Sequence, residues 1–215
     1  MTAISQALRK LEKIVAANTD ECADIESEKT LVEHAKTSAA AFGQLYEIHY
    51  SAILNYIYRR TLNKNAAEEL TSNTFFNALN ALPKYHHKAP FRAWLYRIAL
   101  NELRMFFRKE KRRRTTEQTF LWKEDIERIY FHGLNVEERE ASMKQYAHLH
   151  REISNLPMRY QEVIAFRFFE NLEYFEISQI LGKRMGTVKS LIHRGLKRLR
   201  KQMEKQDATF FENRH

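Results

Sequence analysis

The chain contains very few of the residues that interrupt helices. Five glycines and three prolines occur in 215 residues, whereas average usage of roughly 12% would give about 26. β-Sandwiches, barrels and meanders need a turn residue every few positions, so this scarcity argues against them. Because 44% of the residues are hydrophobic and 12% aromatic, there is enough apolar mass for a core. We therefore predict an all-α protein.

The net charge of +9 is unevenly distributed along the chain. Residues 41–114 and 144–215 carry net charges of +9 and +6, whereas residues 1–40 and 115–143 carry −2 and −4. Two basic modules on an acidic tether suit bipartite contact with a polyanion, because phosphate neutralisation is additive over contacts. A solvated basic surface without a ligand explains the charge equally well.

Charge and helical periodicity together suggest two small helical domains joined by a linker. The domains span residues 41–114 and 144–203, and the acidic linker spans 115–143. A partly helical extension at 1–40 precedes them, and a tail at 204–215 follows.

The first basic block predicts three helices. Apolar and aromatic residues recur at three- and four-residue steps over 42–57, which indicates one helix. A second helix starts near Lys64 and ends at Pro83, and a third follows from Phe91. The segment between Pro83 and Pro90 is a predicted loop, because both prolines block helix continuation.

The third of these helices carries two stripes of different character. The residues predicted to face inward are Phe91, Trp94, Leu95, Ile98 and Met105. Beside them runs a polar stripe, formed by Arg97, Asn101, Arg104 and Arg108. Arginine contacts phosphates or guanine edges, and asparagine pairs with adenine, so the helix suits a nucleic-acid surface. A solvated helix face would give the same stripe.

The second basic block predicts a helix-turn-helix. A helix ends near Asn155, and Pro157 lies in the first turn of the next. A short helix then covers 173–181, Gly182 takes the left-handed conformation at the break, and a last helix begins near Gly186. The predicted inward residues are Tyr160, Val163, Ile164, Phe168, Tyr174, Ile177, Leu181, Val188, Ile192, Leu196 and Leu199.

The last helix is rich in side chains that bind DNA. Two short helices joined by a tight turn, the second loaded with Lys and Arg, are typical of a helix-turn-helix, and the N-terminal part of the second helix enters the major groove. The outward, base-facing candidates are Lys183, Arg184, Thr187, Lys189, Ser190, Leu191, His193, Arg194 and Lys197.

Motifs in both blocks point to one family. The second block carries LP-x-x-x-Q-E-V, Y-x-E-I and G-T-V-K-S-x-x-H-R-G, and the first carries AAEELTSNTFF and FRAWLYRIALNELRMFFRKEKRRR. In these motifs the chain resembles bacterial sigma factors of the extracytoplasmic-function type, with the blocks similar to regions 2 and 4. The helix-turn-helix motif alone would also fit a generic regulator, whereas the upstream W-L-Y-R-I-A-x-N favours a sigma factor.

The resemblance implies a mechanism and a set of partners. Region 2 of the family binds the clamp of core RNA polymerase and melts the −10 promoter element, and region 4 binds the polymerase flap and the −35 duplex. The implied polymerase contacts are Glu68, Glu69 and Asn73. The implied −10 contacts are Lys84, Tyr85, Lys88, Arg97, Asn101, Arg104 and Arg108, with the loop from Lys84 to Lys88 capturing an unstacked base. The nine base-facing candidates would contact the −35 duplex. An anti-sigma factor that masks these faces is a further implied partner.

The chain departs from the family's pattern at two places. The family usually has A-E-D-L-T-Q-E-x-F where residues 67–75 are AEELTSNTF, so two polar polymerase contacts are changed. The family often has Arg at the position of Leu191. An apolar residue there can pack on a thymine methyl group, which predicts a shifted −35 preference.

The remaining features suggest a soluble cytoplasmic protein without membrane insertion. The single cysteine, Cys22, excludes an internal disulfide, and no apolar run approaches the roughly 18 residues of a membrane span. No catalytic motif is present, so we expect no enzyme activity. His86, His87, His148 and His150 lack neighbouring cysteines, and we predict no metal and no cofactor. The alternatives are a stand-alone helix-turn-helix regulator, acting as a dimer, and a helical RNA-binding protein.

Overall fold

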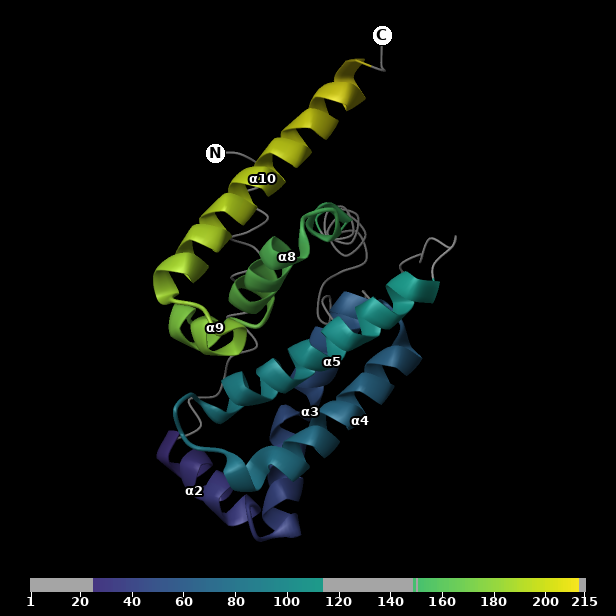
Figure 1. Cartoon of the computed structure of the whole chain (residues 1–215). Helices are drawn as coiled ribbons and strands as arrows, with labels where there is room; N and C mark the ends of the chain where they lie inside the picture. The colour runs from purple at the N-terminus through teal and green to yellow at the C-terminus, as the bar shows by residue number, and fades with distance from the viewer. Residues whose placement is uncertain (1–24, 114–148, 150, 213–215) are drawn as a thin grey trace, which may run out of the picture. The chain divides into compact units, whose positions relative to one another are not determined.

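The computed structural model describes residues 25–113, 149 and 151–212, and every regular element in these ranges is helical (Figure 1). The all-α prediction is thus confirmed for this part of the chain. The helices divide into two compact units, one made of α2 to α5 and one of α8, η2, α10 and most of α9. The predicted linker at 115–143 and residues 1–24 of the predicted extension lie outside the described residues. None of the described helices is both long and apolar enough to cross a membrane.

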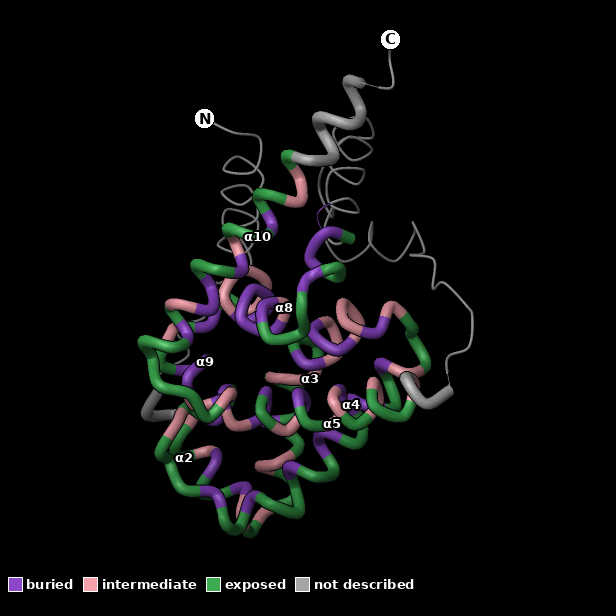
Figure 2. The backbone as a smooth tube through the Cα atoms, turned by 45° about the horizontal axis from the view of Figure 1, so that its top comes forward, coloured by how far each residue is buried: buried purple, intermediate pink, exposed green. Residues whose placement is uncertain are grey.

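The first unit is a helical bundle whose boundaries follow the predicted ones closely. Its elements are α2 (Ile25–Ala35), α3 (Ala39–Thr61), α4 (Lys64–Ala81), the 3-10 turn η1 (Leu82–Lys84) and α5 (Phe91–Arg113). α3 packs against α2, α4 and α5, and α4 packs against α5. Its fully buried side chains include Leu45, Ile53, Tyr56, Ile57, Leu82, Leu95 and Leu103. Figure 2 colours the backbone by burial, with buried positions in purple.

Polar side chains fix where two of these helices begin. The Ser38 hydroxyl accepts a hydrogen bond from the Ala41 N–H at 3.3 Å, and the Asn63 side chain accepts one from the Ala66 N–H at 3.0 Å. Each thereby satisfies a donor that the first turn leaves without an intrahelical partner. Between α3 and α4 the chain reverses at Leu62, whose φ of 51° lies in the left-handed region.

The inward stripe predicted for the third helix of this block is wrong at its C-terminal end. Met105 of α5 is 57% exposed, whereas Ala99, Leu100 and Leu103 are buried. At about 100° per residue, Met105 points roughly 200° away from Leu103. In the last turns of α5, the predicted stripe therefore does not coincide with the buried face.

The second unit contains α8 (Met158–Ile164), the π-turn η2 (Ala165–Phe169), α9 (Tyr174–Leu181) and α10 (Met185–Glu212). α8 packs along α10. Phe166 is buried, while the predicted core residue Phe168 is only half-buried. A π-turn changes the angular spacing of successive side chains, so a 3.6-residue period cannot be extended across it. Residues 204–212, predicted to be a tail, continue α10.

One buried hydroxyl in the first unit makes no hydrogen bond within the described part of the chain. Thr71 of α4 is fully buried and its Oγ1 is without a partner there, whereas the equally buried Thr74 donates to the Leu70 carbonyl oxygen at 2.7 Å. An unsatisfied buried polar group costs folding free energy that a satisfied one does not.

We therefore expect Thr71→Val to raise the free energy of unfolding of the first unit by about 1 kcal/mol. Urea unfolding followed by the fluorescence of Trp94, in a chain whose other tryptophan Trp122 is replaced by Phe, measures this change. Thr74→Val is the matched control and should give no gain, because it removes a hydrogen bond. Equal effects of the two substitutions would contradict the assignment.

Candidate nucleic-acid interface

Hydrogen bonds fix the geometry of the turn between α9 and α10. At the start of α9 the Glu173 N–H donates to the Glu176 carboxylate at 2.9 Å, and the Ile177 N–H donates to the Glu173 carbonyl at 2.9 Å. The Glu176 side chain thus caps the N-terminus of α9 by reaching back three residues, as in one half of a capping box. At the other end Gly182 takes a φ of +61°, and the Lys183 N–H donates to the Ser178 carbonyl at 3.0 Å. The predicted turn and its left-handed glycine are confirmed.

The N-terminal part of α10 carries most of the predicted base-facing residues on its exposed surface. Ser190 is half-buried, and those that are exposed are Lys183, Arg184, Thr187, Lys189, His193, Arg194 and Lys197. Residues 177–203 contain eight Lys and Arg but no Asp or Glu. The positive end of the helix dipole adds to this charge, so the surface is suited to a polyanion.

Leu191 does not face outward as predicted. Only 8% of it is exposed, because it lies on the buried stripe of α10 together with Val188 and Ile192. These positions are related by the three- and four-residue steps that bring side chains to one helix face. A contact between Leu191 and a thymine methyl group therefore has no support in the structure.

Two of the exposed cations of α10 are held by neighbouring side chains. Arg194 donates to the Ser190 hydroxyl from Nε at 3.1 Å and from a terminal nitrogen at 2.6 Å. Lys189 Nζ lies 5.5 Å from the ring centroid of Tyr174, and the guanidinium of Arg167 lies 5.3 Å from the same ring. Because these long side chains are already restricted, less of their conformational entropy is lost when a ligand binds.

The polar stripe of α5 is also accessible. Arg97, Asn101 and Arg108 are exposed and Arg104 is half-buried. Arg108 Nε donates to the Arg104 carbonyl at 3.3 Å, which directs its side chain back along the helix. The exposed Met105 lies among these residues on the helix surface. The stripe thus combines three arginines, an asparagine and one apolar side chain.

The loop that precedes α5 is more firmly held than the sequence suggested. Lys84 and Lys88 are exposed, but Tyr85 is buried and its hydroxyl donates to the Ala89 carbonyl at 2.6 Å. The Tyr85 ring lies 4.9 Å from the Trp94 ring and 5.9 Å from the Phe91 ring, centroid to centroid. The expectation that Tyr85 offers a free ring to an unstacked base is therefore wrong for this conformation.

Burial and two nearby carboxylates perturb Tyr85. Desolvation, followed by the charges of Glu28 and Glu33, raises the pKa of Tyr85 to about 12. The side chain is therefore neutral and able to donate its hydrogen bond throughout the physiological range. It serves as an internal support of the loop.

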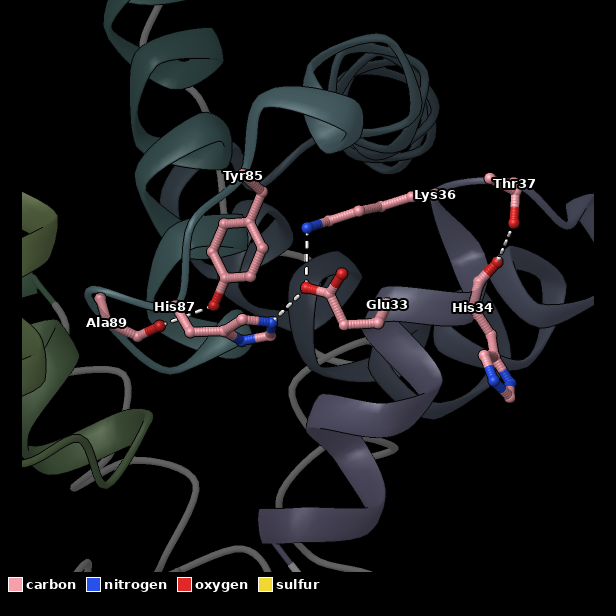
Figure 3. A network of polar contacts seen from close by, with 7 residues as sticks. All are labelled: Glu33, His34, Lys36, Thr37, Tyr85, His87 and Ala89. Atoms are coloured by element: carbon pink, nitrogen blue, oxygen red, sulfur yellow. Dashed lines mark hydrogen bonds and ion pairs between the residues drawn. The ribbon is translucent and has the colours of Figure 1, made fainter.

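Sequence reasoning missed a connection between this loop and α2. His87 Nε2 lies 2.6 Å from Glu33 Oε1, and Lys36 Nζ lies 2.7 Å from the same oxygen (Figure 3). Hydrogen bonds from Lys36 and His87 lower the pKa of Glu33, although burial opposes them. The two residues are 54 positions apart, so the sequence gives no periodic signal for this contact. No group of three or more His, Cys, Asp or Glu residues that could hold a metal occurs in the described ranges.

α4 presents a mixed polar and apolar face. The predicted polymerase contacts Glu68, Glu69 and Asn73 are all exposed. Phe76, which follows Glu69 and Asn73 on one helix face, is 66% exposed. The signal for this exposure was available, because the three- and four-residue steps through Ala67, Leu70 and Ala78 include Phe75 and leave Phe76 outside the buried face.

The two units and their exposed faces define a helical protein with a helix-turn-helix and a second basic module. Comparison with known proteins then gives its family. The chain matches the model of sigma-70 region 2 over residues 45–113 and that of sigma-70 region 4 over residues 147–199. The chain therefore belongs to the sigma-70 family, and its relatives place it in the extracytoplasmic-function type. It is a sigma factor that directs transcription initiation.

Individual relatives are similar over most of their length. The chain is 31% identical to the RNA polymerase sigma factor YlaC of Bacillus subtilis over 161 residues, which is 75% of this chain and 91% of the relative. It is 29% identical to the ECF RNA polymerase sigma factor SigW of the same organism, over 81% of this chain and 95% of the relative.

Solved structures of low sequence identity share the fold. CnrH, solved in complex with the cytosolic domain of CnrY, superposes with a TM-score of 0.59 at 22% identity, covering 82% of this chain and 96% of CnrH. RpoE from Bartonella quintana, solved with the anti-sigma factor NepR, gives a TM-score of 0.58 at 19% identity, covering 76% of this chain and 96% of RpoE.

Proposed function

We propose that the chain binds core RNA polymerase and directs it to promoters through two separate contacts. The unit of α2 to α5 recognises and melts the −10 element, and the unit of α8 to α10 binds the −35 duplex. The observation that carries this assignment is the exposed N-terminal surface of α10, which is basic and free of acidic side chains. This surface directly follows the hydrogen-bonded turn of the helix-turn-helix. The match to sigma-70 region 2 covers the first unit and the match to region 4 covers the second, which supports this assignment.

On this proposal the exposed cations have distinct tasks. Lys84, Lys88 and the α5 stripe of Arg97, Asn101, Arg104 and Arg108 contact the −10 element, whose strands are opened there. The −35 contacts are Lys183, Arg184, Thr187, Lys189, Ser190, His193, Arg194 and Lys197. Tyr85 supports the −10 loop from within, and Leu191 supports α10 from the buried side.

The partners follow from the same faces. Glu68, Glu69, Asn73 and Phe76 of α4 form the polymerase-binding face. Two similar folds were solved with CnrY and with an anti-sigma factor as partners, which supports an anti-sigma factor for this chain as well. The protein acts in the cytoplasm, where the polymerase is, and catalyses no reaction itself. It requires no cofactor and no metal.

The test is transcription in vitro from a genomic promoter library with core polymerase, with and without the chain. We expect initiation at promoters that share one pair of −35 and −10 sequences, and only when core polymerase and the chain are both present. Tight binding of the isolated chain to a palindromic duplex as a dimer would instead indicate a stand-alone regulator. A shift of RNA without any support of transcription would indicate an RNA-binding protein.

In the holoenzyme, we expect Arg194→Ala to weaken promoter binding by about 1–3 kcal/mol and to relax selectivity at one −35 position, as for loss of a base-contacting arginine. Lys197→Gln should weaken binding evenly across sequences and reduce the slope of log K against log salt by about one, as for loss of a phosphate contact. Both are measured by promoter binding at several salt concentrations. Arg200→Gln, at an exposed position farther along α10, is the matched control. If it matched the other two, the N-terminal surface of α10 would have no special role.

The face of α4 yields a separate expectation. Phe76→Ser should weaken binding to core polymerase about tenfold or more, since an exposed phenyl ring that becomes buried contributes roughly 1.5–3 kcal/mol. Ile48→Ser, at a 51% exposed apolar position of α3, is the control and should leave the affinity unchanged. Competition with an unrelated sigma factor for core polymerase measures both. Unchanged binding by the Phe76 variant would exclude this face.

A further inference from the structure

The contact between Glu33 and His87 joins an element outside the matched region 2 to the loop that precedes α5. α2 ends at Ala35, ten residues before the family match begins at residue 45. The Glu33 carboxylate nevertheless lies 2.6 Å from His87 Nε2. In the sequence, His87 stands between Lys84 and Lys88, the two exposed lysines assigned to the −10 element. Figure 3 shows the carboxylate of Glu33 directed at the ring.

Tyr85 and Glu33 are the two side chains that attach the loop to the rest of the unit. Backbone hydrogen bonds in the loop run from the Tyr85 N–H to the Leu82 carbonyl and from the Lys88 N–H to the His86 carbonyl. Both connect residues two or three apart, so they shape the loop without attaching it to the bundle. Tyr85 anchors the loop through its buried ring and reaches the outer half through its bond to the Ala89 carbonyl and through the His87 ring, 5.0 Å away centroid to centroid. Glu33 adds an attachment of the outer half to α2 through His87.

Glu33 is itself held in place before it meets the loop. Lys36 Nζ binds the same carboxylate oxygen at 2.7 Å, one helical turn away. α2 in turn is connected to α3 by Glu28, whose carboxylate lies 3.1 Å from His49 Nε2. The carboxylate is therefore presented from an element that is fixed to the body of the unit. The low pKa of Glu33 keeps it charged at neutral pH.

We infer that Glu33 is a positioning residue for promoter recognition, which holds the loop at residues 84–89 in the geometry that contacts the −10 element. Glu33 itself need not touch DNA, because it acts on the bound strand through His87. This inference rests on the proposed function, since it assumes that the loop contacts the −10 element.

The experiment compares single and double variants of the full chain with two readouts. One is the −10 preference of the holoenzyme in promoter-library transcription, and the other is the amide hydrogen exchange of residues 84–89 in the free chain. We expect Glu33→Ala and His87→Ala each to change the −10 preference at least threefold and to speed loop exchange several-fold, while −35 preference stays unchanged. The double variant should resemble either single variant, because both remove one contact.

Three further variants separate positioning from charge and from folding. Glu33→Gln can still form a hydrogen bond with His87, so it should retain much of the wild-type preference. If Glu33 acted only by repelling DNA, Gln and Ala would behave alike. Lys36→Gln removes the side chain that holds Glu33, so it should shift the −10 preference in the same direction as Glu33→Ala but by less. Glu47→Gln removes an exposed carboxylate of α3 and should leave the −10 preference unchanged. A variant that lost its helical circular dichroism would be replaced by Glu33→Ser or His87→Ser, whose side chains are too short to form this contact.

Each failure has a distinct meaning. Wild-type −10 preference in Glu33→Ala, with an active wild-type holoenzyme, would overturn the inference and leave the proposed function standing, whether or not loop exchange changed. A changed preference with unchanged loop exchange would overturn it as well, because Glu33 would then act without the loop. If the wild-type chain supported no initiation with core polymerase, the proposed function would fail, and the inference with it.

Discussion

The close approach of α10 to α8 at Gly195 determines which side chains the second unit offers to a ligand. A Cβ atom at this position would lie 3.1 Å from Ile164 Cδ1 and 3.3 Å from Tyr160 Cβ, so the backbone of α10 lies directly against α8. This contact fixes the rotation of α10 about its own axis. Val188, Ile192 and Leu199 then point inward with it, and the basic side chains are left on the opposite surface.

The same contact explains why two predictions of burial in α10 were wrong. Leu191 lies four residues before Gly195 and is drawn toward the buried side. Leu196, which was predicted to be buried, is only half-buried, since the glycine occupies the centre of the interface. An apolar residue next to a basic stripe gives no indication in the sequence of which side it joins. The rotation of the helix decides this, and it depends on a glycine in another turn.

The sequence was sufficient where local chemistry determines the structure. Scarce glycine and proline predicted helices, Pro83 and Pro90 predicted the loop, and Gly182 predicted the left-handed turn. It was insufficient where the structure depends on a changed period or on long-range contacts. Phe168 was misplaced because a π-turn alters the helical period, and Tyr85 was misplaced because its partners Ala89 and Trp94 could be recognised only in three dimensions. The DNA-binding role proposed for the basic residues rests on the resemblance to a family, and the structure adds their exposure.

The two units differ in how they hold the residues assigned to DNA. The cations of α10 stand on a helix whose backbone is continuous, so the spacing between Lys189, Arg194 and Lys197 is fixed by helical geometry. A regular spacing is suited to a duplex, whose groove is itself regular. Lys88 of the 84–89 loop follows no helix, and its position depends on the Tyr85 anchor and on the contact of His87 with Glu33. An unstacked base has no regular groove to follow, so a loop shaped by tertiary contacts is better suited to it. In this chain the surface proposed to bind the duplex is therefore determined by one helix, whereas the surface proposed to bind the opened strand requires α2, the loop and α5 together.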